Sequence, residues 1–254
     1  MIKVVLIGSG NVARHLFNVF TQHTAFELIQ IVGRNGQALK NFGANVNCTT
    51  DFSKIKDSDI YIIAVSDDAI PSISKLLESK DGLIVHTSGN TPIGVLSNHK
   101  RSGVFYPLQT FSKDRKVDFR NVPFCLEASN REDLELLKKM ASHISDSVFE
   151  VSSNQRESLH VAAVFVNNFT NHLYHLGSRI CDENKLSFEI LKPLIMETAR
   201  KLNDLSPYDA QTGPARRGDE DSLKKHLHQL KSENEREIYT LLSQSIQNAY
   251  GKKL

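Results

Sequence analysis

The residues Gly8-Ser9-Gly10-Asn11-Val12-Ala13 have the types and spacing of a turn that binds the pyrophosphate of a dinucleotide. The first glycine can adopt a tight turn, the second leaves room for the pyrophosphate, and the small Ala13 lets a helix pack closely on the preceding strand. The backbone N–H groups of Asn11 and Val12 would face the phosphates at the positive end of the helix dipole. We therefore predict that Gly8, Ser9, Gly10, Asn11 and Val12 bind a dinucleotide cofactor. The alternative is a glycine-rich turn in an α/β domain that binds nothing.

The choice between NAD and NADP depends on the residue that ends the second strand. In NAD-binding proteins an acidic residue there binds the ribose 2′-hydroxyl. Here the strand ends in Ile31-Val32-Gly33-Arg34, so a guanidinium stands 24 residues after Gly10. A guanidinium can pair with a 2′-phosphate and stack on the adenine. The sequence thus predicts NADP(H) bound through Arg34, unless Arg34 is a solvated surface charge.

Small polar residues follow two further strands. Ligands of open parallel sheets lie beyond the carboxyl ends of the strands. Those ends are Val65-Ser66 and Thr87-Ser88. We expect Val65, Ser66 and Thr87 to border the cofactor, and Ser88 to be a candidate catalytic residue near the nicotinamide.

A polar face on a long apolar segment offers a candidate proton donor. His160 and Asn167 are seven residues apart, hence on one face of an α-helix and about 10 Å apart along its axis. His160 could donate a proton as hydride reaches a carbonyl or imine carbon, while Asn167 or Asn168 orients the substrate. The alternative is that these groups only form hydrogen bonds within an interdomain core.

Adjacent arginines between glycines offer a candidate anion-binding loop. Arg216 and Arg217 lie in the segment Gly213–Asp219, and guanidinium groups bind carboxylates and phosphates well. We therefore predict that both contact an anionic substrate, although the segment is also suitable as an ordinary interhelical loop.

No metal site is predicted. Cys48, Cys125 and Cys181 are far apart in the sequence, which indicates neither a disulfide framework nor a zinc knuckle. His172 and His175 are at i and i+3, but no nearby cysteine or carboxylate completes a ligand set.

The elements that must position these residues change in character along the chain. Up to about residue 152, short apolar runs alternate with amphipathic ones, which is typical of a parallel sheet with crossover helices. The expected strands are Lys3–Ile7, Leu28–Val32, a weak one near Val46, Ile60–Val65, Leu83–His86, Gly103–Tyr106, Phe124–Glu127 and Val148–Val151. The expected helices are about Val12–Thr21, Gln37–Phe42, Ala69–Leu77 and Arg131–Ile144, then Asn154–Cys181, Ser187–Asn203 with Pro193 interrupting it, Glu220–Ser232 and Asn234–Tyr250. The fold class is therefore α/β, a Rossmann doubly wound, mostly parallel sheet (1–152) followed by an all-α domain (153–254).

Composition narrows the possible partners and location. A formal net charge of +2 does not suggest a nucleic-acid partner. No signal peptide precedes the first strand, so a cytoplasmic location is expected. The uncharged stretch Ser158–Ser178 is long enough to span a membrane, but its histidines and asparagines are costly in lipid, so we interpret it as a buried helix. Apolar residues recur at spacings of three and four from Leu159 to Ile180, a stripe longer than a small helical domain covers, which predicts a homodimer.

Four segments carry a resemblance to a known family: Ala64–Ile70, Val85–Gly89, Tyr106–Phe111 and Thr212–Asp219. They resemble a bacterial family of Rossmann-like proteins labelled NADP oxidoreductases, whose helical C-terminal domain has no known function. The wider group includes proteins similar to pyrroline-5-carboxylate reductase and 6-phosphogluconate dehydrogenase. This resemblance implies a C-terminal domain like that of 6-phosphogluconate dehydrogenase, dimerisation through it, and an active site between the domains.

Two positions depart from the patterns that the resemblance implies. The family usually has histidine where this chain has Tyr106, which argues against an acid–base role for that position. The β-hydroxyacid dehydrogenases of the wider group use a lysine on the long helix, and this chain has none between Asn154 and Cys181. Their mechanism therefore does not transfer.

The function expected from the sequence is hydride transfer between NADP(H) and a small, anionic carbonyl or imine compound. The competing class is a non-catalytic NADP(H)-binding sensor or interaction protein. A third possibility is hydride exchange with a deazaflavin.

Overall fold

The computed structural model describes residues 1–43 and 46–251. These residues fall into two compact units that divide after Asn167. The sheet ends at Glu150 and the next helix begins at Ser153, whereas the two units meet further along that helix. The predicted domain boundary at 152/153 stays a prediction.

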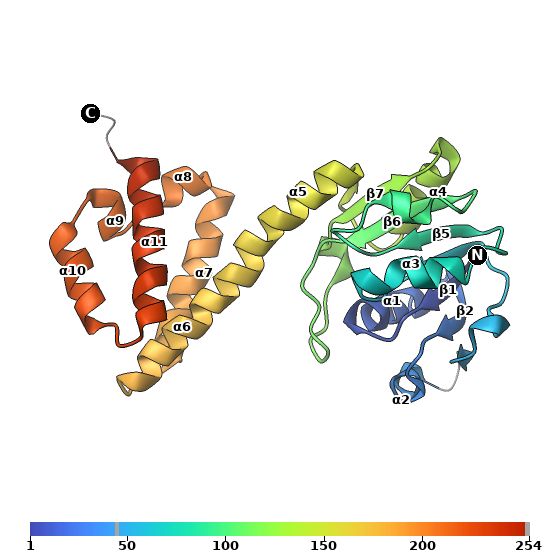
Figure 1. Ribbon diagram of the computed structural model, residues 1–254, viewed down its shortest axis with the longest axis horizontal. Coiled ribbons are helices and arrows are strands. Elements are labelled where there is room, and N and C mark those ends of the chain that lie inside the picture. The colour runs from blue at the N-terminus through green and yellow to red at the C-terminus, as the bar shows by residue number, and fades with distance from the viewer. Residues whose placement is uncertain (44–45, 252–254) are drawn as a thin grey trace. The chain divides into compact units, whose positions relative to one another are not determined.

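The first unit is built on one eight-stranded sheet with the order β3-β2-β1-β4-β5-β6-β7-β8. All neighbouring strands are parallel except β6 and β7, which pair antiparallel. The predicted Rossmann-like, mostly parallel sheet is therefore confirmed (Figure 1). The strands are β1 Ile2–Ile7, β2 Phe26–Val32, β3 Cys48–Thr49, β4 Ile60–Ile63, β5 Leu83–His86, β6 Ser102–Pro107, β7 Phe124–Ala128 and β8 Val148–Glu150.

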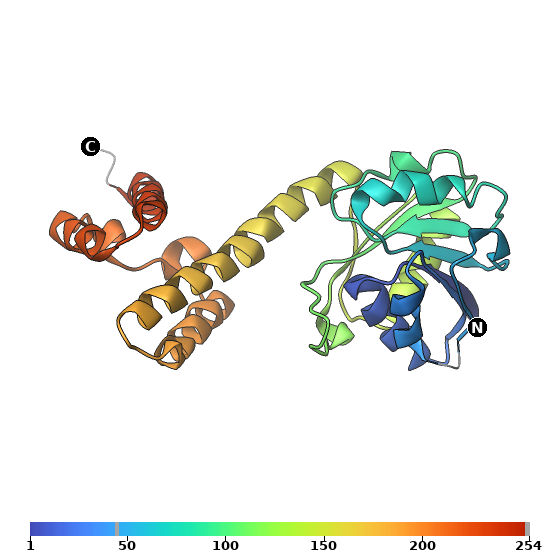
Figure 2. The ribbon, with the colours of Figure 1, turned by 60° about the horizontal axis from the view of Figure 1, so that its bottom comes forward.

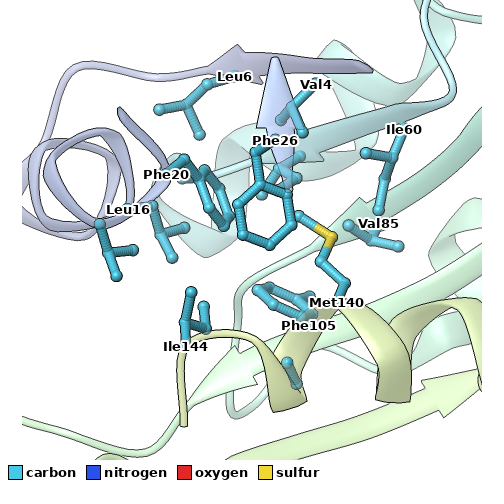
Figure 3. Packing of buried hydrophobic residues seen from close by; sticks show 14 of the residues in the cluster. Val4, Leu6, Leu16, Phe20, Phe26, Ile60, Val85, Phe105, Met140 and Ile144 are labelled. Atoms are coloured by element: carbon cyan, nitrogen blue, oxygen red, sulfur yellow. The ribbon is translucent and has the colours of Figure 1, made fainter. Parts of the chain in front are cut away.

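Helices cover both faces of this sheet, which explains why its central strands are continuous apolar runs. On one face α1 (Asn11–Thr21) and α4 (Arg131–Ser142) pack against the strands, and Leu16, Phe20 and Met140 join the larger core cluster (Figure 3). On the other face α3 (Ile70–Lys75) contributes Ile70 and Ile73 to a second cluster. The sheet is thus held rigidly, and its strand ends are fixed points for a site.

The local departures from the expected elements have simple causes. The weak strand near Val46 is the two-residue β3, Cys48–Thr49. The expected helix Gln37–Phe42 is α2 (Gly36–Leu39) followed by a 3₁₀ turn. Helix α2 begins at Gly36 because the Asn35 side chain caps it by accepting a hydrogen bond from the Ala38 N–H. Pro71 lies in the first turn of α3, where its missing N–H costs nothing.

The long apolar segment is a helix with an unexpected turn in its middle. It consists of α5 (Ser153–Ala163), a π-helical turn (Val164–Phe169) and α6 (Thr170–Glu183). The interpretation of this segment as a buried helix is wrong for the single chain, since Val161 is 54% exposed and Val166 75% exposed. Periodicity identifies an apolar face but not what covers it.

The second unit is entirely helical, as predicted, in the part that the structure describes. Its helices after α6 are α7 (Lys192–Arg200), α8 (Pro207–Ala210), α9 (Pro214–Arg217), α10 (Glu220–Gln229) and α11 (Glu233–Tyr250). Helices α10 and α11 lie side by side in both views (Figures 1 and 2). The predicted helix Ser187–Asn203 is divided just before Pro193, as expected: a 3₁₀ helix (Phe188–Leu191) precedes α7, and Pro193 lies in the first turn of α7. The short helices α8 and α9 were not predicted, because four residues carry no periodicity.

No helix within residues 1–43 and 46–251 is long and apolar enough to cross a membrane.

Candidate functional site

The turn between β1 and α1 has the geometry of an anion-binding site. Gly8 has φ 133°, and a Cβ there would collide with the carbonyl of Ala64. Gly10 has open space where a side chain would stand. Helix α1 has no side-chain cap and no acidic residue in its first turn, so its first N–H groups are available to an anion. These residues fit a dinucleotide pyrophosphate.

A pocket of about 530 Å³ lies over this turn at the carboxyl ends of the strands. It stands beside β1, where the strand order reverses, which is the usual ligand position in a doubly wound sheet. The lining residues are Ile7, Gly8, Ser9, Gly10, Asn11, Val12, Gly33, Arg34, Asn35, Phe52, Ala64, Val65, Ser66, Ile73, Gln109 and Phe111. The lining includes every predicted cofactor-binding residue except Thr87.

Gln109 and Phe111 are pocket residues that sequence reasoning did not assign. They follow β6, and the Nδ2 group of Asn11 holds their loop to α1 by donating to the carbonyl of Phe111 at 2.9 Å. One turn later, Nε2 of the buried His15 lies 3.0 Å from the carbonyl of Ser112, and its ring packs on Phe111. In the sequence, the segment Tyr106–Phe111 shows only a family resemblance, and its residue types do not indicate that it lines a pocket.

Arg34 is exposed at the end of β2, at the mouth of the same pocket. The neighbouring Asn35 uses its side chain to cap α2. No carboxylate lines the pocket among the residues that the structure describes. The electrostatics at this end therefore favour an anionic group.

The end of β5 carries buried polar residues whose hydrogen bonds shape a turn. Ser88 is buried, and its Oγ accepts hydrogen bonds from the N–H groups of Asn90 and Thr91 at 3.1 and 2.9 Å. Nδ1 of His86 accepts one from the Ser88 N–H at 3.2 Å. Burial lowers the pKa of His86 to about 4, and the charge of Arg156 acts in the same direction. His86 is therefore neutral at physiological pH, and the lone pairs of Ser88 are committed to the turn.

Tyr106 and His160 meet above Gly89. The Tyr106 hydroxyl lies 3.3 Å from Nδ1 of His160. A Cβ on Gly89 would stand 2.7 Å from that nitrogen and 2.8 Å from the hydroxyl. Glycine at this position is thus a condition for the contact.

A buried ion pair fixes the first turns of α5 to the sheet. Arg156 is 1% exposed, and its Nη1 donates to Glu127 at 2.6 Å. Its Nη2 donates to the carbonyl of Thr91 at 2.7 Å. Ser153 also bonds Glu127, at 2.8 Å, and receives a hydrogen bond from the N–H of Ile93 at 3.0 Å. His160, one turn after Arg156, therefore starts from a rigid base.

The π-helical turn changes the predicted relation of His160 to Asn167. Hydrogen bonds from i to i+5 place one more residue in a turn than an α-helix has. Asn167 lies within that turn, so its spacing from His160 is not that of a regular α-helix, and the prediction that the two share a face stays a prediction. Asn167 and Asn168 are both exposed.

In the helical unit, Arg216 and Arg217 have different surroundings. Nη1 of Arg216 donates to the carbonyls of Asp209 and Gln211, and the guanidinium lies 5.1 Å from the ring centroid of Tyr250. Arg217 is exposed and has no hydrogen-bond partner among the described residues. Arg216 thus already holds its own loop together, whereas Arg217 is available.

A second pocket, of about 600 Å³, lies between α1 and the loop Lys113–Asp118. It includes none of the glycine turn between β1 and α1, although it is the larger of the two. No group of three or more potential metal ligands occurs in the described ranges.

Fold and pocket together define a Rossmann-like protein with a pocket at the sheet's switch point whose lining fits a dinucleotide. Over 97% of its length the chain is 40% identical to a putative NADP oxidoreductase from Bacteroides fragilis, of which it covers 98%, with a TM-score of 0.90. The chain belongs to the family of that protein, which confirms the resemblance drawn from its motifs. Residues 122–246 match a family described as "Domain of unknown function (DUF2520)".

More distant structures share the fold. A protein from Thermotoga maritima is 20% identical, with coverage of 97% of this chain and 98% of that one and a TM-score of 0.73. A reductive aminase from Aspergillus terreus, in complex with NADPH and ethyl levulinate, is 13% identical, with coverage of 99% and 95% and a TM-score of 0.66. No curated protein matches.

Proposed function

We propose that this protein is an NADP(H)-dependent oxidoreductase that transfers hydride to or from a small carbonyl or imine compound. The observation that carries the proposal is the pocket at the uncapped start of α1, with Arg34 at its mouth. The Bacteroides fragilis relative is described as a putative NADP oxidoreductase, and the Aspergillus terreus protein is described as a reductive aminase in complex with NADPH and ethyl levulinate.

Each part of the pocket has a task toward the cofactor. The N–H groups of Asn11 and Val12 bind the pyrophosphate, and Gly10 leaves it room. Arg34 pairs with the 2′-phosphate, which NAD lacks. Val65 and Ser66 border the nicotinamide half, with Thr87 beyond them at the end of β5. The bound cofactor supplies the hydride.

The proton needed for reduction comes from His160, and the substrate is held near Ser88 by Asn167 or Asn168. The Ser88 hydroxyl accepts two backbone hydrogen bonds but keeps its own proton as a donor. In this scheme it donates to the carbonyl oxygen or imine nitrogen as charge develops there.

Cofactor titration tests the first half of this proposal. NADPH should bind more tightly than NADH, and Arg34→Ala should weaken NADPH by about 10- to 100-fold, the worth of one charge-assisted contact of about 1.5–3 kcal/mol. The matched control is Arg131→Ala, which removes an exposed arginine of α4 that pairs with Glu135. Equal affinity of wild type and Arg34→Ala for NADPH would refute the assignment.

Turnover distinguishes an enzyme from a non-catalytic sensor. NADPH oxidation is followed across a panel of keto acids, imino acids and aldehydes, and His160→Gln should reduce any activity found. A deazaflavin is added in a parallel assay, where a change in its absorbance would identify it as the hydride acceptor. NADPH binding without turnover in any arm favours the sensor.

The available guanidinium of Arg217 supports an anionic substrate. Because Arg216 is held by carbonyl groups and Tyr250, its replacement disturbs the loop. Arg217→Ala removes an exposed charge that makes no hydrogen bond among the described residues but interacts electrostatically with Asp219. Arg217→Ala should raise KM for the substrate and leave NADPH affinity unchanged. An unchanged KM would remove Arg217 from substrate binding.

The helical unit supports association through a second copy of the chain. Its buried hydrophobic side chains, among those described, are Leu176, Cys181, Ala215 and Leu223. Many large apolar side chains of the same unit are exposed, among them Ile190 at 67%, Leu194 at 64% and Leu241 at 68%. A domain of this size needs a larger core, and each such side chain gains about 1.5–3 kcal/mol on burial. We infer a homodimer whose two helical units form one shared core.

Light scattering with size exclusion tests the dimer. Wild type should have twice the mass of the chain, and Leu194→Asp should shift it toward the monomer. Asn18→Asp introduces the same charge at an exposed polar position of α1, outside the helical unit, and serves as the control. A monomeric wild type would overturn the inference.

A further inference from the structure

The contact between Tyr106 and His160 joins a strand end to a helix. Tyr106 lies at the end of β6 and His160 on α5, 54 residues apart in sequence, and the bond runs from the hydroxyl to Nδ1. The rings meet edge to face, with centroids 6.3 Å apart. This geometry restrains both the position and the rotation of the imidazole.

Both ends of the contact are held in place. Tyr106 belongs to a strand paired on both sides, by β5 and β7. His160 follows the buried Arg156, whose guanidinium bonds Glu127 and the carbonyl of Thr91. Gly89 offers no side chain that would separate the two rings.

The phenol is suited to hold the ring in either charge state. Burial raises the pKa of Tyr106 to about 12, so the hydroxyl keeps its proton. A hydroxyl both donates and accepts. It donates to Nδ1 when the neutral imidazole carries its proton on Nε2, and its oxygen accepts from an Nδ1–H, in the imidazolium or in the other neutral tautomer.

The other ring nitrogen is left for a ligand. Nε2 of His160 has no hydrogen-bond partner among the described residues and is not an orphaned buried atom. The side chain is half-buried. Nε2 is therefore the nitrogen that a substrate can reach.

We propose that Tyr106 is a positioning residue, which holds Nδ1 of His160 so that Nε2 presents the proton to the substrate. The proposal rests on the proposed oxidoreductase function. In the reduction, bound NADPH would supply the hydride that forms a C–H bond at the carbonyl or imine carbon, and the Nε2–H of the His160 imidazolium would protonate the oxygen or nitrogen. The ring is left neutral with its remaining proton on Nδ1, still bonded to the Tyr106 oxygen. Tyr106 itself neither gains nor loses a proton.

Nitrogen NMR tests the contact without any substrate. The protein is labelled with ¹⁵N-histidine, and the Nδ1 signal of His160 is assigned by its loss in His160→Gln. In neutral His160 this signal should have the chemical shift of a nitrogen that accepts a hydrogen bond. Tyr106→Phe should return it to the shift of an unbonded, unprotonated nitrogen, whereas Tyr106→His, which restores a hydrogen-bonding side chain, should recover part of the change. Tyr61→Phe removes another buried tyrosine hydroxyl of the sheet and should have no effect.

The same samples separate this proposal from the proposed function. An Nδ1 signal that already lacks a hydrogen bond in wild type, or that is the same in wild type and Tyr106→Phe, overturns the positioning role. The result in wild type alone tests the positioning role even if Tyr106→Phe does not fold. The cofactor assignment fails instead if wild type does not bind NADPH. Once a substrate is known, Tyr106→Phe should lower kcat by about 10- to 100-fold, the cost of a misplaced acid, with NADPH affinity kept. An unchanged kcat would also overturn the proposal.

Discussion

Acid should destabilise the Rossmann unit through His86. This residue is fully buried at the end of β5, its Nδ1 accepts the Ser88 N–H, and its Nε2 has no partner among the described residues. Burial, aided by the charge of Arg156, lowers its pKa from 6.5 to about 4. The unfolded chain, with the ordinary pKa, therefore takes up a proton at a higher pH than the folded chain does.

The sign and the size of the effect follow from this difference. Above pH 6.5 His86 is neutral in both the folded and the unfolded chain, and its full contribution to the free energy of unfolding is present. As the pH falls from 6.5 toward 4, His86 takes up a proton in the unfolded chain only, which stabilises that state. A difference of roughly 2.5 units at 1.36 kcal/mol per unit gives about 3 kcal/mol. That is a large part of the stability of a typical domain, about 5–15 kcal/mol.

The assay compares the pH dependence of unfolding in two proteins. Urea unfolding is followed by circular dichroism, since the chain has no tryptophan, for wild type and His86→Asn, whose amide oxygen can still accept the Ser88 N–H. The variant should lose about 3 kcal/mol less than wild type between pH 6.5 and 4. Burial also lowers the pKa of His99, but that effect is common to both proteins and cancels. Parallel curves for the two proteins would refute the reasoning.

Three further substitutions test the site's scaffold. Asn11→Ala should weaken NADPH binding by about fivefold, because it removes one hydrogen bond, of about 1 kcal/mol, that holds the wall at Phe111. Titration against wild type measures the change, and an unchanged affinity contradicts the role. Gly8→Ala should abolish NADPH binding or lower the melting temperature, because Gly8 has a positive φ and an added Cβ would collide with the Ala64 carbonyl. A variant that keeps wild-type NADPH affinity and melting temperature would show that the turn tolerates a side chain. Glu127→Ala should cost about 3–5 kcal/mol in urea unfolding by leaving a buried guanidinium without its partner, and a loss under 1 kcal/mol would contradict the burial of that pair.

The sheet and the glycine turn that follows β1 could be predicted from the sequence because their signals are local. Each central strand is a short apolar run, and the sequence Gly8–Ala13 directly follows one of them. Strand direction is not encoded in apolar runs, so the antiparallel pairing of β7 with β6 was not foreseen in detail.

The rest of the site depends on how distant segments meet. Phe111 lines the pocket only because its loop returns to α1, 100 residues away along the chain from Asn11. The contact of Tyr106 with His160 likewise spans 54 residues. The prediction that the long helix is buried is wrong for the single chain, because a periodic pattern identifies the apolar side chains of one face but not the element that packs against them.

The π-helical turn Val164–Phe169 affects how relatives of this protein should be aligned. A wider turn amounts to one inserted residue inside an otherwise continuous helix. A relative without that turn needs a one-residue gap there, although gaps are normally placed in loops. Without the gap, every later position of the helix would be compared with a residue from a neighbouring face, and the apolar stripe from Leu159 to Ile180 is better treated as two shorter stripes.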